Sequence, residues 1–186
     1  MDTRKAIKQV LREDTIKNKP TKLAVFDFDG TLAYSPEPEI GKPQYKKVTG
    51  QDWPHKGWWS KPESLDTNIF DIPVNPSVVS DYKKEKSNPD TLVIMMTGRI
   101  PKLSKQVEDI LSANNLSFDY YLYNNANATL DFKINTMEKL LSKYPTITEV
   151  ILYDDRDEHI PVFQHFGNEL VKNKKLLNFN VVHVKN

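Results

Sequence analysis

Two aspartates separated by one residue are the strongest chemical signal in the chain. Asp27 and Asp29 follow the apolar run 23–26, which predicts a short buried parallel strand. Side chains alternate in an extended chain, so both carboxylates are expected on one side, and Gly30 allows a sharp turn after them. Carboxylates this close repel each other unless a cation or a proton intervenes. The pair suggests a divalent metal with phosphoryl chemistry, although an ordinary Asp-Gly turn after a strand also explains it.

Polar residues also follow two later apolar runs. Thr97-Gly98-Arg99 comes after the predicted strand 91–96, and Asp154-Asp155-Arg156 comes after the predicted strand 149–153. Lys133 is expected in the first turn of a helix that Asp131 caps. A lysine at the positive end of a helix dipole is unfavourable, which suggests that it points at an anion. A solvated lysine explains the same position.

The expected elements alternate between strands and helices. Amphipathic helices are predicted from Pro76, from Pro101, from Asp131 and after 156, and an N-terminal one over 2–17. Further strands are predicted at 118–123 and, as an edge strand, at 178–184. This alternation predicts an α/β fold with a parallel sheet of about five strands and right-handed crossovers. The carboxyl ends of such strands converge on one crevice, so the scattered polar residues are expected to meet there.

Residues 33–75 differ in composition from the rest of the chain. Six prolines and all three tryptophans occur in this segment. Proline at this density argues against long helices and central strands, so we expect loops with a short hairpin. We interpret the segment as a modest irregular insertion within a single domain spanning 1–186. It acts either as a lid or substrate platform, or as a surface loop that packs its own aromatic residues.

Composition excludes several classes of protein. The chain has 186 residues, a net charge of +1 and no cysteine, which rules out disulfides, thiolate metal sites and thiol catalysis. No overall charge marks it as a nucleic-acid or membrane binder. The first residues lack the apolar core of a signal peptide, and no run is long enough to span a bilayer. We therefore expect a cytoplasmic protein without membrane contacts.

Taken in order, these motifs resemble those of the haloacid dehalogenase (HAD) superfamily. The resemblance implies a Rossmann-like three-layer fold and a phosphatase that works through an aspartyl-phosphate. Asp27 would be the nucleophile and Asp29 the general acid and base, with Thr97 and Lys133 contacting the phosphoryl group. Mg²⁺ would be held by Asp27, by the backbone carbonyl of Asp29, and by Asp154 with Asp155 beside it.

The finer resemblance is to 3′-phosphatase domains of polynucleotide kinase-phosphatases and to the HAD domain of "Swiss Army Knife" RNA-repair proteins. It rests on Thr97-Gly98-Arg99, Asp154-Asp155-Arg156 and the Gly57-Trp58-Trp59 stretch. The implied substrate is a terminal phosphate of nucleic acid, with Gly98, Arg99, Arg156 and Trp58 on the substrate side. For the arginines a structural ion pair is an equal alternative, and for the tryptophans packing inside the insertion is slightly favoured over stacking on a terminal base.

Two other functions fit the same residues. One is a phosphatase of nucleotides or sugar phosphates, and the other is a non-catalytic protein that binds phosphorylated ends. The presence of both Asp27 and Asp29 favours an enzyme over a binding protein. The chain has no G-x-x-x-x-G-K-[ST] phosphate loop, so any kinase or ligase that works with it is expected to be a separate partner.

Overall fold

The structure is a computed structural model that describes residues 19–125 and 127–185. The predicted N-terminal helix over 2–17 lies outside the described residues.

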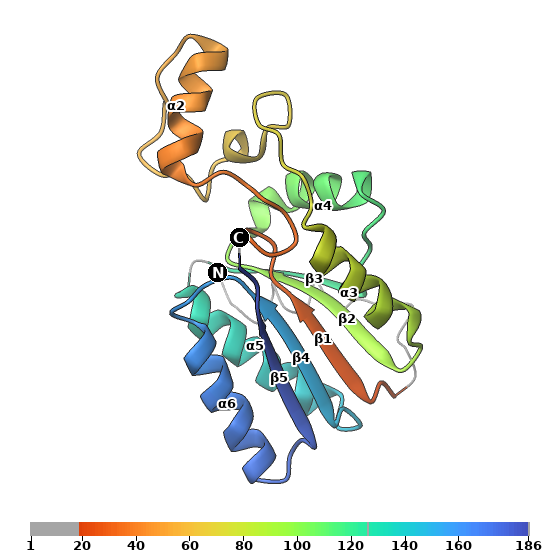
Figure 1. Cartoon of the computed structure of the whole chain (residues 1–186). Coiled ribbons are helices and arrows are strands. Elements are labelled where there is room, and N and C mark those ends of the chain that lie inside the picture. Colours follow the sequence, from red (N-terminus) through yellow and green to blue (C-terminus); the bar gives the residue numbers. More distant parts are fainter. Residues whose placement is uncertain (1–18, 126, 186) are drawn as a thin grey trace.

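A five-stranded parallel sheet forms the centre of the molecule (Figure 1). Its order is β3-β2-β1-β4-β5, and every neighbouring pair is parallel. The strands are β1 (Lys22–Phe26), β2 (Thr91–Thr97), β3 (Tyr120–Tyr123), β4 (Glu149–Asp154) and β5 (Asn178–His183). This confirms the predicted α/β fold, with β5 at an edge as expected. The third strand begins two residues later than predicted.

Helices cover both faces of the sheet, which makes three layers (Figure 1). The helices are α3 (Pro76–Ser87), α4 (Ser104–Ala113), α5 (Thr129–Lys143) and α6 (Ile160–Lys172), and a 3₁₀ turn, η2 (Pro101–Leu103), precedes α4. On one face, Phe26 packs with residues of α3 and α4. On the other face, Val25 packs with Met137 of α5 and Phe163 of α6. Because β1 and β2 are buried on both faces, their central residues, 23–26 and 92–96, are continuously apolar and not alternating.

The insertion, residues 33–75, lies over the end of the sheet where the strands finish (Figure 1). It contains a 12-residue helix, α2 (Pro38–Thr49), and a 3₁₀ turn, η1 (Pro62–Leu65). The prediction of loops with a hairpin was therefore wrong. Pro38 begins α2, where its missing N–H is not needed, and Pro43 lies inside it with an exposed ring.

Packing against the insertion's own aromatic residues compensates for the proline inside α2. A Cβ at Gly41 would lie 2.1 Å from Cη2 of Trp58, so glycine is what allows the indole to lie directly against this helix. Tyr45 meets Trp53 edge to face with ring centroids 5.1 Å apart. The helix is thus held by tertiary contacts that local propensity does not reveal.

The start of α5 also differs from the prediction. The helix begins at Thr129, and Asp131 is its third residue and not its cap. Lys133 therefore lies in the second turn, although its side chain leans back toward the carboxyl ends of the strands. No helix in the described part of the chain combines the length and apolar composition needed to cross a membrane.

Candidate active site

Lys133 joins the ends of β1 and β4. Its Nζ lies 2.7 Å from Oδ1 of Asp27 and 2.6 Å from Oδ2 of Asp154. Asp27 follows β1 directly, and Asp154 is the last residue of β4, the strand paired with β1. The side chains of Lys133, Asp27 and Asp154 are 1%, 6% and 0% exposed. The three residues form a dry cluster in which one ammonium is shared by two carboxylates.

Burial and neighbouring charges set the protonation of this cluster. Burial, opposed by Lys133 and reinforced by the charges of Asp154 and Asp155, raises the pKa of Asp27 to about 7. Burial would lower the pKa of Lys133, but the charges of Asp27 and Asp154 outweigh it and raise that pKa. Burial also opposes ionisation of Asp154, yet the adjacent His159 and Lys133 lower its pKa to about 2. Asp27 is thus the carboxylate whose charge is least favourable without a further cation.

Asp29 lies in a separate ion pair. Nη2 and Nε of Arg99 donate to Oδ1 and Oδ2 of Asp29 at 2.8 and 3.0 Å, and Ser35 Oγ donates to Oδ1. Burial alone would raise the pKa of Asp29, but the charge and hydrogen bonds of Arg99, with the Ser35 bond, hold it below its usual range. Asp29 is therefore ionised in the free protein, a state suited to a general base.

Arg99 is almost fully buried, with 1% of its surface exposed. Besides Asp29, its guanidinium donates from Nη1 to Oγ of Ser64 at 2.6 Å and to the backbone carbonyl of Trp59 at 2.9 Å. The guanidinium carbon also lies 4.8 Å from the centroid of the Trp59 ring. The structural ion pair that the sequence left open as an alternative is thus present, and it leaves the arginine little surface for substrate.

The other predicted residues lie near the Lys133 cluster and the Asp29–Arg99 pair. Thr97 Oγ1 accepts a hydrogen bond from the Arg99 N–H at 3.1 Å, which leaves its own O–H to donate. A Cβ at Gly98 would lie 3.0 Å from Oγ1 of Thr129, so this glycine brings the loop close to the start of α5.

Arg156, in the loop after β4, is half-buried, and its charge acts on both Asp29 and Asp155. The carboxylate of Asp155 accepts a bond from Thr31 Oγ1 at 3.4 Å, and burial and Asp154 raise its pKa.

Trp58 lies away from any surface that substrate could reach. It is 3% exposed, its indole N–H donates to the carbonyl of Pro36 at 2.9 Å, and its ring packs on Gly41 and Phe70. This burial contradicts the prediction that Trp58 contacts substrate and gives it a packing role in the insertion. Trp59, through its contact with Arg99, is the tryptophan beside the candidate site.

Oxygen donors for a hard cation are present at the ends of β1 and β4. Asp27 and Asp154 share one ammonium, and the metal-free cluster leaves the charge of Asp27 poorly compensated, so a divalent cation would suit this place. Within 19–125 and 127–185, no three or more Asp, Glu or His side chains lie together in a way that could hold a metal ion. One or two carboxylates, a backbone carbonyl and water are nevertheless the usual ligands of Mg²⁺. The residues fit that set, and ligation by Asp27, Asp29, Asp154 and Asp155 stays a prediction.

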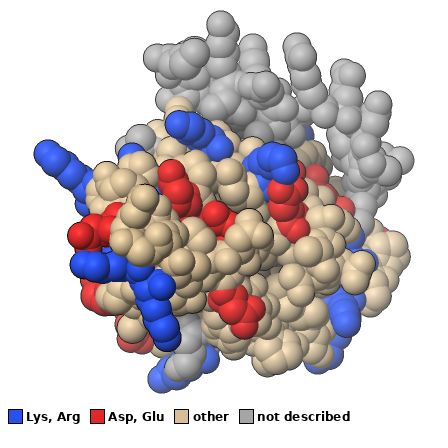
Figure 2. Space-filling view, turned by 90° about the horizontal axis from the view of Figure 1, so that it is seen from above, with Lys and Arg blue, Asp and Glu red and all other residues tan. Residues whose placement is uncertain are grey.

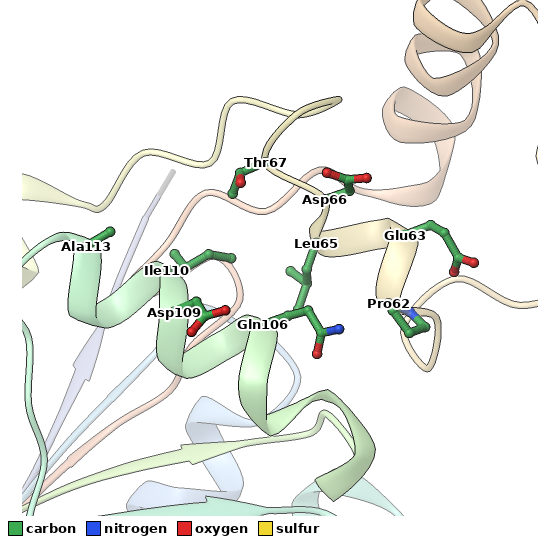
Figure 3. A pocket seen from close by; sticks show the side chains of 9 residues that line it. All are labelled: Pro62, Glu63, Leu65, Asp66, Thr67, Gln106, Asp109, Ile110 and Ala113. Atoms are coloured by element: carbon green, nitrogen blue, oxygen red, sulfur yellow. The ribbon is translucent and has the colours of Figure 1, made fainter.

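A separate hollow of about 500 Å³ lies between η1 and α4 (Figure 3). Its lining includes Glu63, Asp66, Gln106 and Asp109, and none of the residues predicted for the site. Residues of η1 line this hollow, and the same turn carries the buried Ser64.

Sequence reasoning missed Ser35 and Ser64, both of which contact the Asp29–Arg99 pair. Neither serine carries a local signal, because a serine in a proline-rich segment is ordinary. The contacts join residues 35 to 70 positions apart for Arg99, so only the folded chain brings them together.

The fold is that of an HAD-type α/β domain, with acids at the ends of β1 and β4 and a lysine from α5 between them. The sequence model of the family described as "HAD domain family 1 in Swiss Army Knife RNA repair proteins" matches residues 35–186. The chain belongs to this family, and the resemblance drawn from its motifs is confirmed. It is therefore an HAD-family domain related to the HAD domains of RNA repair proteins.

The individual proteins that the chain matches have low sequence identity to it. The chain is 28% identical over 173 residues to the Saccharomyces cerevisiae protein "Uncharacterized protein YMR265C", a match that covers 81% of this chain and 38% of the yeast protein. One chain of the solved Pnkp1/Rnl/Hen1 complex matches with a TM-score of 0.55 and 19% identity, over 95% of this chain and 49% of that one. The HAD domain of the effector Lem4 from Legionella pneumophila matches with a TM-score of 0.51 and 12% identity, over 89% of this chain and 86% of that domain. The chain thus spans about half or less of the first two relatives, and these structural likenesses show the fold alone.

Proposed function

We propose that the protein is a Mg²⁺-dependent phosphomonoesterase that removes a terminal 3′-phosphate from nucleic acid, as in RNA end repair. The observation that carries the chemistry is the buried ammonium of Lys133 shared by Asp27 and Asp154. It places a fixed positive charge beside the nucleophile, at the point where a carboxylate and a phosphate dianion would otherwise repel each other.

Asp27 attacks phosphorus and forms an aspartyl-phosphate, while Asp29 supplies a proton to the leaving oxygen. The ion pair with Arg99 keeps Asp29 ionised in the free protein, so Asp29 takes up a proton from solvent water as the negatively charged phosphate approaches and raises its pKa. In the second half-reaction Asp29 accepts a proton from water, for which its ionised state is already suited. Thr97 donates to a phosphoryl oxygen, and Lys133 offsets the negative charge. When bound, Mg²⁺ would neutralise charge on the phosphoryl oxygens.

The choice of a nucleic-acid end rests on family membership and on the form of the surface. The matched family is described from RNA repair proteins, and a structural neighbour is the Pnkp1/Rnl/Hen1 RNA repair complex. On the part of the upper face visible in Figure 2, acidic and basic side chains are interspersed and form no continuous basic track. Such a surface suits recognition of a chain end better than recognition of a long backbone. Arg156, whose charge acts on Asp29, is the cation proposed to meet substrate, and a kinase or ligase is proposed to act with this domain in repair.

The test is phosphate release in Mg²⁺ from matched RNA and DNA oligonucleotides that carry a 3′-phosphate or a 5′-phosphate. Nucleotides and sugar phosphates complete the panel, and Asp27→Asn is the blank. Preference for 3′-phosphorylated oligonucleotides would support the proposal. Preference for a small phosphate ester would keep the mechanism and reject the repair assignment. Oligonucleotide binding without release from any substrate would indicate a binding protein instead.

A further inference from the structure

Ser64 connects the insertion to Asp29 through one buried guanidinium. Its Oγ accepts from Nη1 of Arg99 at 2.6 Å, while the other edge of the same guanidinium holds both oxygens of Asp29. Ser64 is 0% exposed, Arg99 is 1% exposed, and the Asp29 side chain is 17% exposed. These contacts connect η1, through Arg99, to the loop after β1.

The hydroxyl of Ser64 is itself fixed in direction. It donates to the backbone carbonyl of Lys61 at 2.7 Å, so its lone pairs are left for Arg99. The backbone N–H of Ser64 also bonds to Lys61 O, at 3.1 Å, within the turn that forms η1. Ser64 is therefore a rigid acceptor and not a mobile surface hydroxyl.

A guanidinium is a planar fork, so fixing one edge also orients the opposite edge. We propose that Ser64 is a positioning residue for Asp29, acting through Arg99, and that the insertion thereby takes part in proton transfer. This rests on the proposed phosphatase function. The Trp59 carbonyl, which accepts from the same Nη1 at 2.9 Å, lies in the insertion as well and assists in holding it.

The role has a chemical signature that general folding defects lack. In the first step the ester P–O bond breaks, the bond from phosphorus to Asp27 forms, and the proton of Asp29 passes to the leaving oxygen. In the second step water attacks phosphorus, gives a proton to Asp29 and releases the Asp27 carboxylate. A basic alkoxide needs the proton as it leaves, whereas p-nitrophenolate leaves readily without it. Misplacing Asp29 therefore slows alkyl esters much more than activated aryl esters.

The experiment compares wild type, Ser64→Ala and Ser87→Ala on p-nitrophenyl phosphate, phenyl phosphate and an alkyl phosphate in Mg²⁺. Ser87 makes the same local bond as Ser64, from its Oγ to a carbonyl three residues earlier, but lies at the end of α3 away from the site. For Ser64→Ala we expect kcat/KM to fall about tenfold or more on the alkyl ester and less than about twofold on p-nitrophenyl phosphate. Ser87→Ala should behave as the wild type on all three.

The ratio between two substrates is measured on one preparation, so a fraction of unfolded protein does not alter it. A second test adds Ser64→Ala to Asp29→Asn and measures phenyl phosphate, where no further loss is expected if Ser64 acts only through Asp29. The proposal alone would be overturned if Ser64→Ala lowered kcat/KM equally on every ester, or lowered it on none. It would also be overturned if Ser64→Ala lowered kcat/KM as much in the Asp29→Asn background as in the wild type. Absence of phosphate release by the wild type would overturn the proposed function together with it.

Discussion

Replacing Asp27 with asparagine is expected to stabilise the metal-free protein above pH 7, although it removes the proposed nucleophile. Burial and two neighbouring carboxylates raise the pKa of Asp27 from its ordinary 3.8 to about 7, despite the bond to Lys133. The unfolded chain loses this proton near pH 4, while the folded protein keeps it until about pH 7. Between these values the folded state binds more protons, so stability falls as the pH rises, and the full penalty applies above pH 7.

The size of the effect follows from the same shift. A difference of roughly three pKa units corresponds to at most about 4 kcal/mol, at about 1.36 kcal/mol per unit. For a chain of this size, 1 kcal/mol moves the melting temperature by about 2–4 °C, so the full effect would be about 8–16 °C. Asparagine has no charge to desolvate and still offers an oxygen to Lys133, so the variant should escape most of this loss.

Thermal unfolding in EDTA from pH 4.5 to 8.5 measures the effect. The melting temperature of the wild type should fall relative to that of Asp27→Asn as the pH rises through this range, with the largest difference at pH 8. Asp71→Asn, at an exposed position of the insertion, is the matched control and should follow the wild type. Adding Mg²⁺ should narrow the difference, because a ligand that binds the folded wild type stabilises it. A variant no more stable than the wild type at pH 8 in EDTA would refute the reasoning.

Two further substitutions test the packing and the charges. Gly41→Ala should cost about 1–3 kcal/mol, because its Cβ would meet Trp58 at 2.1 Å, whereas Gly57→Ala, with nothing closer than 3.8 Å, should be neutral by thermal unfolding. A Gly41→Ala protein as stable as the wild type would show that α2 can shift away from the indole. Lys133→Ala should abolish turnover and lower the melting temperature in EDTA at pH 8, because removing one partner of a buried pair costs about 3–5 kcal/mol. The exposed Lys139→Ala on the same helix should change neither measurement.

The local sequence pattern was sufficient to predict the elements that are buried on both faces. The runs 23–26 and 92–96 are continuously apolar because helices cover both sides of the sheet, so the strands predicted at 23–26 and 91–96 were placed to within a residue. Pro76 likewise marked the start of α3, where the side chain of the preceding Asn75 accepts a hydrogen bond from the N–H of Ser77 at 3.1 Å. These signals lie within a few positions of the features that they determine.

The insertion shows where local pattern fails. Its prolines argued against a helix of 12 residues, but Pro38 occupies the first turn and the ring of Pro43 faces solvent. The helix is stabilised by the contact between Gly41 and Trp58, which are 17 positions apart, and a propensity scale contains no such term. The same contact buries Trp58, which is why a tryptophan interpreted as a substrate contact proved to be core.

The sequence by itself predicted the kind of chemistry, and it determined the edge of the sheet at which the acidic residues gather. Acids placed directly after buried parallel strands must meet at the carboxyl edge, whatever the loops do. Only the tertiary structure decided how the charges are paired: Lys133 with Asp27 and Asp154, and Arg99 with Asp29. The paired residues are 21 to 106 positions apart in the sequence. Each buried charge pairs with the opposite charge that lies within hydrogen-bond distance in the packed interior, and a local stretch of sequence does not contain this information.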